Sequence, residues 1–545
     1  MHLSSLGMGS FKEKEFYRMR KFITSLIAVL VVANLQAQQQ HAPKLVVCIT
    51  IDQLRGDYLE YFKGSFGERG FKRLMNDGVS YKHVQFEFSN IDQASSFATL
   101  FTGANPCYHS ITGKNRYDFE KEQERSCIYD AHYLGNYTHH NFSPKNLLSS
   151  TIGDELKLAS RGASQVFAIA PEPESAILSA GHTADGAFWI DEYNGKWATT
   201  TYYKNAIPKY VDALNSGSQS LSSRLSSISW SPMLSADKYS ALPYIGEKKQ
   251  YNYSFNEKEV GCYPRFKTSP FVNKEVSKLA VQFINNGELG SHATPDLLLV
   301  TFYGGNFYDV LDKPYTQEVQ DIYFQLDQSL GELLDAIDKK VGLSKTLIVI
   351  TGTGYYSDTE AITEGENKIG GTFYPDRCKS LLNMYLRQVY GQKNWIKGYY
   401  NQQIFLDRKT IDDEKIDLAT IQNKAAEFIA EFSGVQQVTT DLSLRAGEWN
   451  EGSAILRYGT HHIGRGDLII ELQPGWGIEN DATGQKNKIK RNSAVITPLF
   501  FFGNELKPAR IERPVYATEI APTITNVLRI RAPNACSDLP LSEIK

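Results

Sequence analysis

The side chains best suited to catalysis or metal binding lie in two stretches. One is the end of a predicted strand, and the other is the start of a predicted helix. Asp52 ends the apolar run KLVVCITID. The stretch FSNIDQASSFATLFTG predicts a helix that begins near Gln93 and carries the hydroxyls of Ser95, Ser96 and Thr99. A carboxylate can bind a metal ion, and a hydroxyl beside a metal can act as a nucleophile. One carboxylate cannot hold zinc alone, however, and a hydroxyl near a helix start more often caps the helix.

The histidines give weak support for a metal site. His461 and His462 could suggest metal binding, but adjacent side chains rarely face one metal ion together. His182 is interpreted as structural, and the sequence assigns no role to His109.

Continuous apolar runs predict the strands that would position these residues. The runs at 44–52, 164–170, 296–303 and 346–352 are typical of strands buried on both faces of a parallel sheet. Between the last two, apolar residues recur at spacings of three and four from 319 to 337. This spacing predicts a helix that joins the two strands by a right-handed crossover.

The rest of the chain completes one large α/β fold. Runs at 466–476 and 496–503 predict two further strands, and 519–530 predicts a closing helix. The segments at about 200–295 and 361–460 break this rhythm, and we interpret both as inserted cap regions. We therefore predict a doubly wound core sheet with helices on both faces. In such folds ligands bind beyond the carboxyl ends of the strands, where the first strand presents its aspartate.

The N-terminus has the pattern of a targeting signal. Basic residues precede an apolar run at 22–33, and the small residue Ala37 follows, which predicts a signal peptide over residues 1–37. A typical signal would start at Met19, so residues 1–18 are a candidate over-extension of the gene start. The apolar run is too short to span a bilayer, so the mature chain is expected to lack a transmembrane anchor. We expect export to the periplasm or the cell surface.

Charge and cysteine usage limit the possible partners further. The formal net charge is −3 and no basic stripe is present, so a nucleic-acid partner is not expected. Export permits disulfides, and Cys107 and Cys127 are the most plausible pair among six cysteines, although the sequence cannot fix their connectivity. Cys48 lies in an apolar run and is expected to be a buried thiol.

Several ordered blocks of the sequence resemble the alkaline phosphatase superfamily. The closest branch is the phosphate-irrepressible alkaline phosphatases, relatives of the type I phosphodiesterases and nucleotide pyrophosphatases, and the resemblance spans most of residues 44–545. It implies two zinc ions held by Asp and His, a Thr or Ser nucleophile, and a clamp for the phosphoryl oxygens. The blocks are KLVVCITIDQLRGDYLEYF, FTGANPCYHSITGKNRYD, AILSAGHTADGAFWID, EVQDIYFQLDQSLGELLDAIDKKVG, GDLIIELQPGW and EIAPTITNVLRIRAPNAC.

Carried over residue by residue, most of the catalytic positions of this family are lost. Asp52 keeps the first aspartate ligand, but Gln93 stands at the nucleophile position. Only one of seven metal or nucleophile positions survives. The replaced ligand positions are Asn306, Val310, Thr353, Gly354 and Asn487.

The phosphate clamp of the family is also changed in charge. Its Lys and Arg align with Glu172 and Glu174, and its asparagine aligns with Lys114. A pocket that held Asp52 and both glutamates without zinc would repel a phosphate dianion, and Lys114 would offset this only in part.

The expected function is therefore that of a catalytically inactive pseudo-phosphatase. It would bind an unknown ligand or envelope protein, with no metal or other cofactor expected. A first alternative is an active metal-dependent phosphomonoesterase or phosphodiesterase with zinc held by relocated ligands, for which Asp309 and Asp312 are candidates. A second alternative is a structural subunit of an envelope complex, with the aromatic insertions as its contact surface. Fold alone does not decide among these.

Cleavage of the signal peptide is directly testable. The mature protein isolated from its native host should begin near Gln38, because Ala37 is the small residue behind the apolar run. Intact-mass measurement and N-terminal sequencing would show this. An uncleaved N-terminus would contradict the prediction of export.

Overall fold

The structure of the protein is a computed structural model, and the chain divides into two units. One comprises residues 1–42 with Lys545, and the other spans 43–544 and holds the fold described below. The predicted signal peptide lies outside the described residues, as do Asp309, Val310 and Asp312. No helix in the described part of the chain is both long and apolar enough to cross a membrane. The described residues are 42–119, 121, 123–239, 251–308, 317–357, 370–447, 451–480, 487–489 and 492–544.

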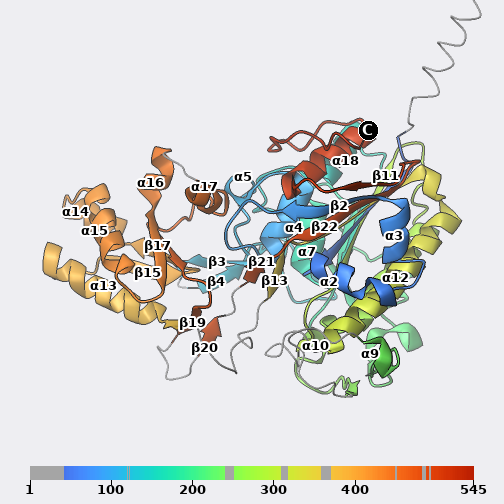
Figure 1. Ribbon diagram of the computed structural model, residues 1–545, viewed down its shortest axis with the longest axis horizontal. Helices are drawn as coiled ribbons and strands as arrows, with labels where there is room; N and C mark the ends of the chain where they lie inside the picture. Colours follow the sequence, from blue (N-terminus) through green and yellow to red (C-terminus); the bar gives the residue numbers. More distant parts are fainter. Residues whose placement is uncertain are drawn as a thin grey trace, which may run out of the picture. The chain divides into compact units, whose positions relative to one another are not determined.

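A large mixed sheet forms the centre of the fold (Figure 1). Its five central strands are mutually parallel, and antiparallel strands flank them on both sides. In spatial order the strands are β23 (Ala509–Ile511), β2 (Val79–Gln85), β22 (Thr497–Gly503), β12 (Thr346–Gly352), β1 (Leu45–Asp52), β11 (Asp296–Tyr303), β6 (Val166–Ala170), β7 (Gly186–Ile190), β8 (Trp197–Thr200) and β5 (Gly135–Asn136), with β24 (Val515–Tyr516) beside β2.

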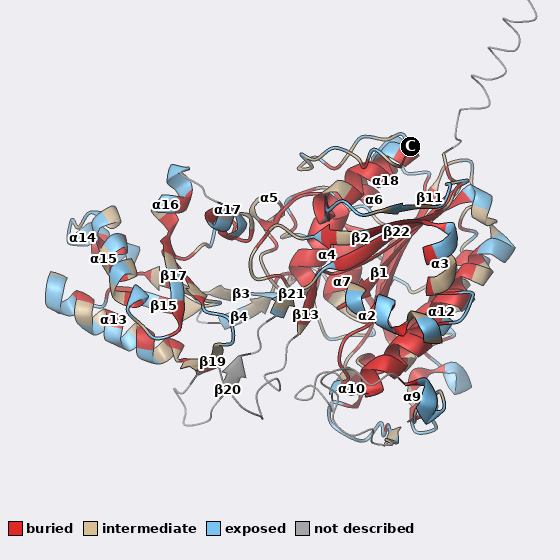
Figure 2. Ribbon diagram, in the orientation of Figure 1, coloured by how far each residue is buried: buried red, intermediate tan, exposed pale blue. Residues whose placement is uncertain are grey.

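Both faces of the sheet are covered by helices, which confirms the predicted α/β fold (Figure 2). All of β1 is buried, with Val47 and Ile49 in one core and Val46 and Cys48 in the other. This burial on both faces explains why the strand reads as an unbroken apolar run. The first core is packed by α2 (Gly56–Phe62), α3 (Phe71–Asp77), α11 (Phe271–Asn286) and α12 (Gln317–Lys340), and the second by α4 (Gln93–Thr102), α6 (Ile152–Ala159), α7 (Pro173–Ala180) and α18 (Ile520–Leu528).

The segments interpreted as insertions differ in how they relate to the central sheet. Within 200–295, short elements lead into α11, whose residues Val276 and Phe283 lie in the first core. Within 361–460, helices pack on a separate four-stranded sheet with its own apolar core. The elements of this second region are α13 (Pro375–Tyr390), β15 (Ile396–Tyr400), β16 (Gln403–Leu406), α14 (Arg408–Asp413), α15 (Leu418–Ala430), β17 (Val435–Thr440), α16 (Asp441–Ala446) and α17 (Glu451–Tyr458).

The smaller sheet takes one strand from the run predicted at 466–476. That run forms β18 (Leu468–Leu472), which pairs with β16 and β17 and not with the central sheet. The smaller sheet also contacts a hairpin that follows α4. The hairpin consists of β3 (Asn115–Asp118) and β4 (Gln123–Ser126), and Tyr117 stacks on Tyr400 with ring centroids 5.6 Å apart.

The predicted disulfide between Cys107 and Cys127 is wrong, because both residues are free thiols. Cys127 is buried in the second core, whereas Cys107 lies half-buried in α5 (Pro106–His109). Burial raises the pKa of the Cys107 thiol to about 11, so it is protonated at neutral pH. Cys48 is a buried thiol, as expected.

Candidate functional site

The carboxyl ends of the parallel strands meet at one edge of the central sheet. Asp52 closes β1 opposite Tyr303, the last residue of β11, and only 3% of Asp52 is exposed. On the other side, β12 ends at Gly352, and the next residue is Thr353. The parallel topology therefore brings together residues that are about three hundred positions apart in the chain, such as Asp52 and Thr353.

A capping box fixes the start of α4 beside this edge. Asp92 is the N-cap residue, and its Oδ1 accepts hydrogen bonds from the backbone N–H of Ser95 at 2.9 Å and from Ser95 Oγ at 2.8 Å. Ser95 Oγ in turn accepts the Asp92 N–H at 3.0 Å. Ser95 thus belongs to the capping box of this helix, as expected for a hydroxyl near a helix start. Gln93, the first helical residue, is thereby held at the strand ends.

Both oxygens of the Asp52 carboxylate are occupied by donors from the chain. Gln93 Nε2 donates to Oδ2 at 2.7 Å, and Thr353 Oγ1 donates to Oδ1 at 3.1 Å. The hydroxyl of Tyr355 provides a further hydrogen bond. Thr353 Oγ1 also accepts the backbone N–H of Gln53 at 2.8 Å, so its hydroxyl is used in both directions.

Burial is the largest influence on the pKa of the Asp52 carboxyl. Desolvation raises the pKa of its carboxyl to about 6, and the hydrogen bonds from Gln93, Tyr355 and Thr353 oppose this rise only in part. The charged form is therefore disfavoured relative to an exposed aspartate. A metal ion would have the opposite effect, because a cation favours the ionised ligand.

The remaining ligand positions do not assemble around Asp52 as a zinc site. Asn306 is buried, and its Oδ1 accepts a hydrogen bond from Tyr356 Oη at 2.6 Å. Asn487 lies in β20 (Asn487–Ile489), where it pairs with Asn480 of β19 (Gly477–Asn480). Zinc requires about four nitrogen, sulfur or oxygen ligands. Within the described ranges, no group of three or more His, Cys, Asp or Glu side chains could hold a metal ion, so these residues do not fit zinc.

Gly354 lies where the backbone and a neighbouring ring leave no room for a side chain. Its φ is +70°, a conformation that favours glycine. A Cβ atom at this position would lie 2.1 Å from Cδ2 of Phe86. A histidine ligand could not be placed here without moving the backbone or the Phe86 ring.

Thr99 and the histidines have partners within the fold, whereas Ser96 Oγ is buried without a hydrogen-bond partner among the described residues. Thr99 Oγ1 and His109 Nε2 are 3.1 Å apart, and burial lowers the pKa of His109 to about 3, so the ring is neutral. His182 bonds to the Asp154 carboxylate through Nδ1 and to a backbone carbonyl through Nε2, as its structural interpretation requires. The rings of His461 and His462 contact each other, with centroids 4.3 Å apart. None of these contacts provides an activated nucleophile.

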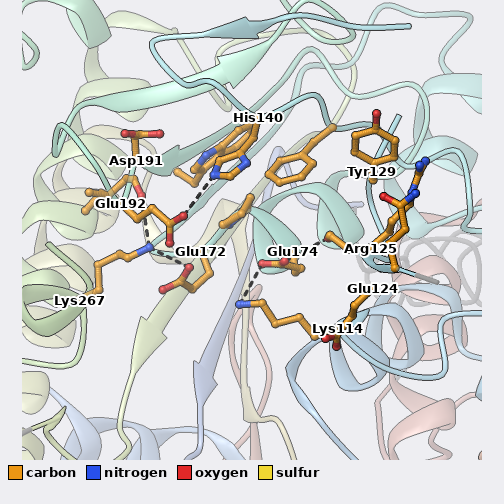
Figure 3. Close-up of a pocket in the computed structure, with 16 residues that line it drawn as sticks. Lys114, Glu124, Arg125, Tyr129, His140, Glu172, Glu174, Asp191, Glu192 and Lys267 are labelled. Carbon is orange, nitrogen blue, oxygen red and sulfur yellow. Dashed lines mark hydrogen bonds and ion pairs between the residues drawn. The ribbon is translucent and has the colours of Figure 1, made fainter. Parts of the chain in front are cut away.

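The three positions expected to correspond to the family's phosphate clamp line a pocket of about 440 Å³ beside the strand ends (Figure 3). Glu172 and Glu174 lie at the start of α7, and Lys114 comes from the turn before β3. Asp52 does not line this pocket, which corrects the expectation that all three carboxylates share one cavity.

Each glutamate in the pocket is paired with a lysine. Lys267 Nζ donates to Glu172 Oε2 at 2.8 Å, and Lys114 Nζ lies 3.5 Å from Glu174 Oε2. Although burial desolvates Glu172, the charges of Lys267 and Lys114 hold its pKa below the ordinary value. Lys267 therefore neutralises Glu172 in addition to the partial offset that was expected from Lys114.

Three residues of this region were not identified from the sequence. Tyr355 follows directly after Thr353 and Gly354, two of the predicted ligand positions. This neighbourhood in the sequence was the one sign that Tyr355 could lie at the site. Lys267 lies in the segment at about 200–295, which has no clear periodicity. Phe86 belongs to no motif that could be recognised in the sequence. Lys267 and Phe86 contact residues that are far away in the chain, and a local sequence pattern cannot predict such contacts.

Comparison with solved structures defines the class of protein. The crystal structure of wild-type alkaline phosphatase PafA superimposes with a TM-score of 0.80 at 27% sequence identity, covering 92% of this chain and 99% of that chain. The fold of this chain is thus that of the alkaline phosphatase superfamily.

Within this superfamily, the chain belongs to the type I phosphodiesterase / nucleotide pyrophosphatase family, whose sequence profile matches residues 46–494. Alkaline phosphatase PafA from Elizabethkingia meningoseptica is 29% identical over 545 residues, covering 95% of this chain and 98% of that protein. Alkaline phosphatase PhoV from Synechococcus elongatus is 26% identical over 548 residues, covering 94% and 97% respectively. The resemblance stated from the sequence is confirmed.

Replacing Asp52 by Asn should remove a pH-dependent loss of stability. Because the folded-state pKa is raised from 3.8 to about 6, the folded state binds the proton more tightly, and stability falls as pH rises between these values. A difference of about two pKa units corresponds to about 3 kcal/mol. Thermal unfolding at pH 5 and pH 8 should show that Asp52→Asn is at least as stable as the wild type at pH 8.

Asp154→Asn is the matched control for this prediction. Asp154 is also buried, but its pKa is lowered, although desolvation opposes this, because His182 and backbone N–H groups bond its carboxylate. The ionised Asp154 carboxylate stabilises the folded state above the unfolded-state pKa, and this stabilisation is lost as pH falls. The free energy of unfolding of Asp154→Asn should therefore be about 2 kcal/mol lower than that of the wild type at pH 8. An equal loss for Asp52→Asn would mean that the fold needs Asp52 charged.

Substitution of Gly354 tests whether the Phe86 ring fills the space beside this residue. Gly354→Ala should destabilise the protein by more than Gly342→Ala, because Gly342 has φ +91° and a Cβ added there would have no neighbouring atom within 4 Å. Both variants carry the backbone cost, about 1–3 kcal/mol, and only Gly354→Ala adds the collision with Phe86. Thermal unfolding measures the difference, and Phe86→Ala should remove most of it in the double variant. Equal costs at the two glycines would contradict this packing.

Proposed function

We propose that the protein is a catalytically inactive member of its family that binds a ligand in the pocket beside the strand ends. The observation that carries this proposal is the engagement of Asp52 by Gln93 and Thr353 at 2.7 and 3.1 Å. An amide and a hydroxyl occupy the carboxylate oxygens that a metal ion would need. The family reaction needs a metal-activated hydroxyl, and Gln93 offers a neutral amide in its place.

The pocket supports a binding role. Its volume of about 440 Å³ falls in the range of small-molecule sites, and it combines aromatic walls with charged groups. It lies at the clamp positions, so ligand binding would survive at this end of the site while the metal end is closed. Export to the periplasm or the cell surface belongs to the same proposal and is supported by the N-terminal pattern of residues 1–37.

The alternative of relocated zinc ligands finds no support among the described residues, because they contain no cluster that could hold a metal ion. Its two named candidates, Asp309 and Asp312, lie outside those residues. The alternative of a structural subunit predicts stable co-purification with a large partner, and a pull-down from the native host would reveal it.

The proposal predicts the absence of phosphatase chemistry. Mature protein equilibrated with zinc and then desalted should carry well under one zinc ion per chain and hydrolyse p-nitrophenyl phosphate at the background rate. Gln93→Thr should also stay at background, because a threonine hydroxyl is a weak nucleophile without a metal to lower its pKa.

Alkaline phosphatase PafA from Elizabethkingia meningoseptica, treated in the same way, is the positive control for both measurements. Elemental analysis gives the zinc content, and absorbance of the released p-nitrophenol gives the rate. Stoichiometric zinc together with hydrolysis that Asp52→Ala abolishes would overturn the proposed function.

A further inference from the structure

Two buried carboxylates in the pocket have oxygen atoms without hydrogen-bond donors. Glu174 is 3% exposed, and its Oε1 accepts a hydrogen bond from Ser126 Oγ at 3.3 Å, while Oε2 accepts none. Asp191 is 2% exposed, and its Oδ1 accepts the backbone N–H groups of Tyr193 and Asn194, while Oδ2 accepts none. A buried acceptor without a donor is costly. Within the described part of the chain, Asp191 Oδ2 has no hydrogen-bond donor, and Glu174 Oε2 has only the ion pair with Lys114 Nζ at 3.5 Å, so both oxygens can accept a further donor.

The cations of the pocket satisfy this need only in part. Lys267 is buried and committed to Glu172 and to the backbone carbonyl of Ile190. Lys114 lies 3.5 Å from Glu174 Oε2, and its side chain is 49% exposed, so this ion pair is open to water. The Glu174 end of the pair is buried, with its side chain 4% exposed, so only the lysine end can move into water when another donor approaches Glu174 Oε2.

The lining as a whole carries more negative than positive charge. Five carboxylates face three cations, which gives a formal charge of −2 with histidine neutral. The carboxylates are Glu124, Glu172, Glu174, Asp191 and Glu192, and the cations are Lys114, Arg125 and Lys267. A partly enclosed cavity with this balance attracts a cation and opposes a phosphate dianion.

Aromatic side chains form the complementary wall. Tyr129, Phe142 and Trp189 line the same pocket, and Figure 3 shows Tyr129 on the side opposite Glu192 and Lys267. Phe142 and Trp189 are 6% and 1% exposed, and the Arg125 guanidinium already lies 5.0 Å from the centroid of the Tyr129 ring. The parts of these rings that reach the pocket therefore offer an apolar contact surface and not a free cation site. The pocket thus offers an apolar wall and carboxylate acceptors to the same small molecule.

We infer that this pocket binds a small organic amine with a compact aromatic or apolar body, and that Glu174 accepts its ammonium hydrogen bonds. This inference rests on the proposed function and deepens it, because it assigns the chemical class of the ligand. The ammonium group supplies the donor that Glu174 Oε2 lacks, and Lys114 moves outward into water to admit it. Asp191 adds negative charge from a neighbouring part of the lining.

Calorimetric titration of the mature protein with a matched pair of probes tests the inference. 2-Phenylethylamine and phenyl phosphate share an aromatic ring and carry opposite charges. The amine should bind saturably with a Kd of about 1 mM or tighter, and phenyl phosphate should give no binding up to about 10 mM. Glu174→Gln keeps the shape of the side chain and should weaken amine binding by at least about tenfold.

Glu512→Gln is the matched control variant. Glu512 pairs with Lys82 on the surface at 3.1 Å and does not line the pocket, so amine binding should be unchanged. Thermal unfolding of both variants shows that each is folded before titration. Asp191→Asn should weaken the amine by a smaller factor than Glu174→Gln.

Three results would overturn the inference. They are no amine binding up to about 10 mM, amine binding that Glu174→Gln leaves unchanged, and phenyl phosphate binding in preference to the amine. Failure here is distinct from failure of the proposed function, which is decided by zinc content and p-nitrophenyl phosphate hydrolysis. An inactive, zinc-free protein that ignores the amine would keep the proposed function and lose only this ligand class.

Discussion

A carboxylate buried at the end of a central strand must be matched by a metal ion or by hydrogen-bond donors, because water cannot reach it. In this protein the match is made by the chain itself, through Gln93, Thr353 and Tyr355. These donors come from the start of α4 and from the turn after β12, so the bonds to Asp52 join three elements at one edge of the sheet. The position of these three elements at the strand ends follows from this arrangement.

The pocket is organised by charges that come from distant segments. The two glutamates at the start of α7 would be an unstable pair if they stood alone, since like charges at short range repel. Lys267 from α10 (Cys262–Lys267) neutralises one of them firmly, and Lys114 approaches the other from the hairpin side. This asymmetry leaves Glu174 as the more available acceptor. This part of the pocket is therefore organised around paired carboxylates.

Much of the fold could be predicted from the sequence, because buried parallel strands are read as unbroken apolar runs. The runs that became β1, β6, β11 and β12 were assigned in this way. The family resemblance, and not the strand pattern, linked Asp52 with Gln93, and the structure joins the two by a hydrogen bond. The partner of β18 was not predictable, since an apolar run does not state which sheet it joins. A pair of cysteines is similarly ambiguous, and Cys107 and Cys127 proved to be free. The sequence also could not show that Lys267 neutralises Glu172 or that Phe86 fills the space beside Gly354, because both contacts are non-local.

The hydrogen bonds around Asp52 also affect how the stability of this edge depends on the concentration of free metal ions. A site built on a dissociable ion gains stability with the logarithm of the free ion concentration, by mass action. The amide of Gln93 and the hydroxyl of Thr353 are covalent parts of the chain and are present at constant stoichiometry. The order that these two contacts give to the strand ends is therefore independent of metal supply and is complete as soon as the chain has folded.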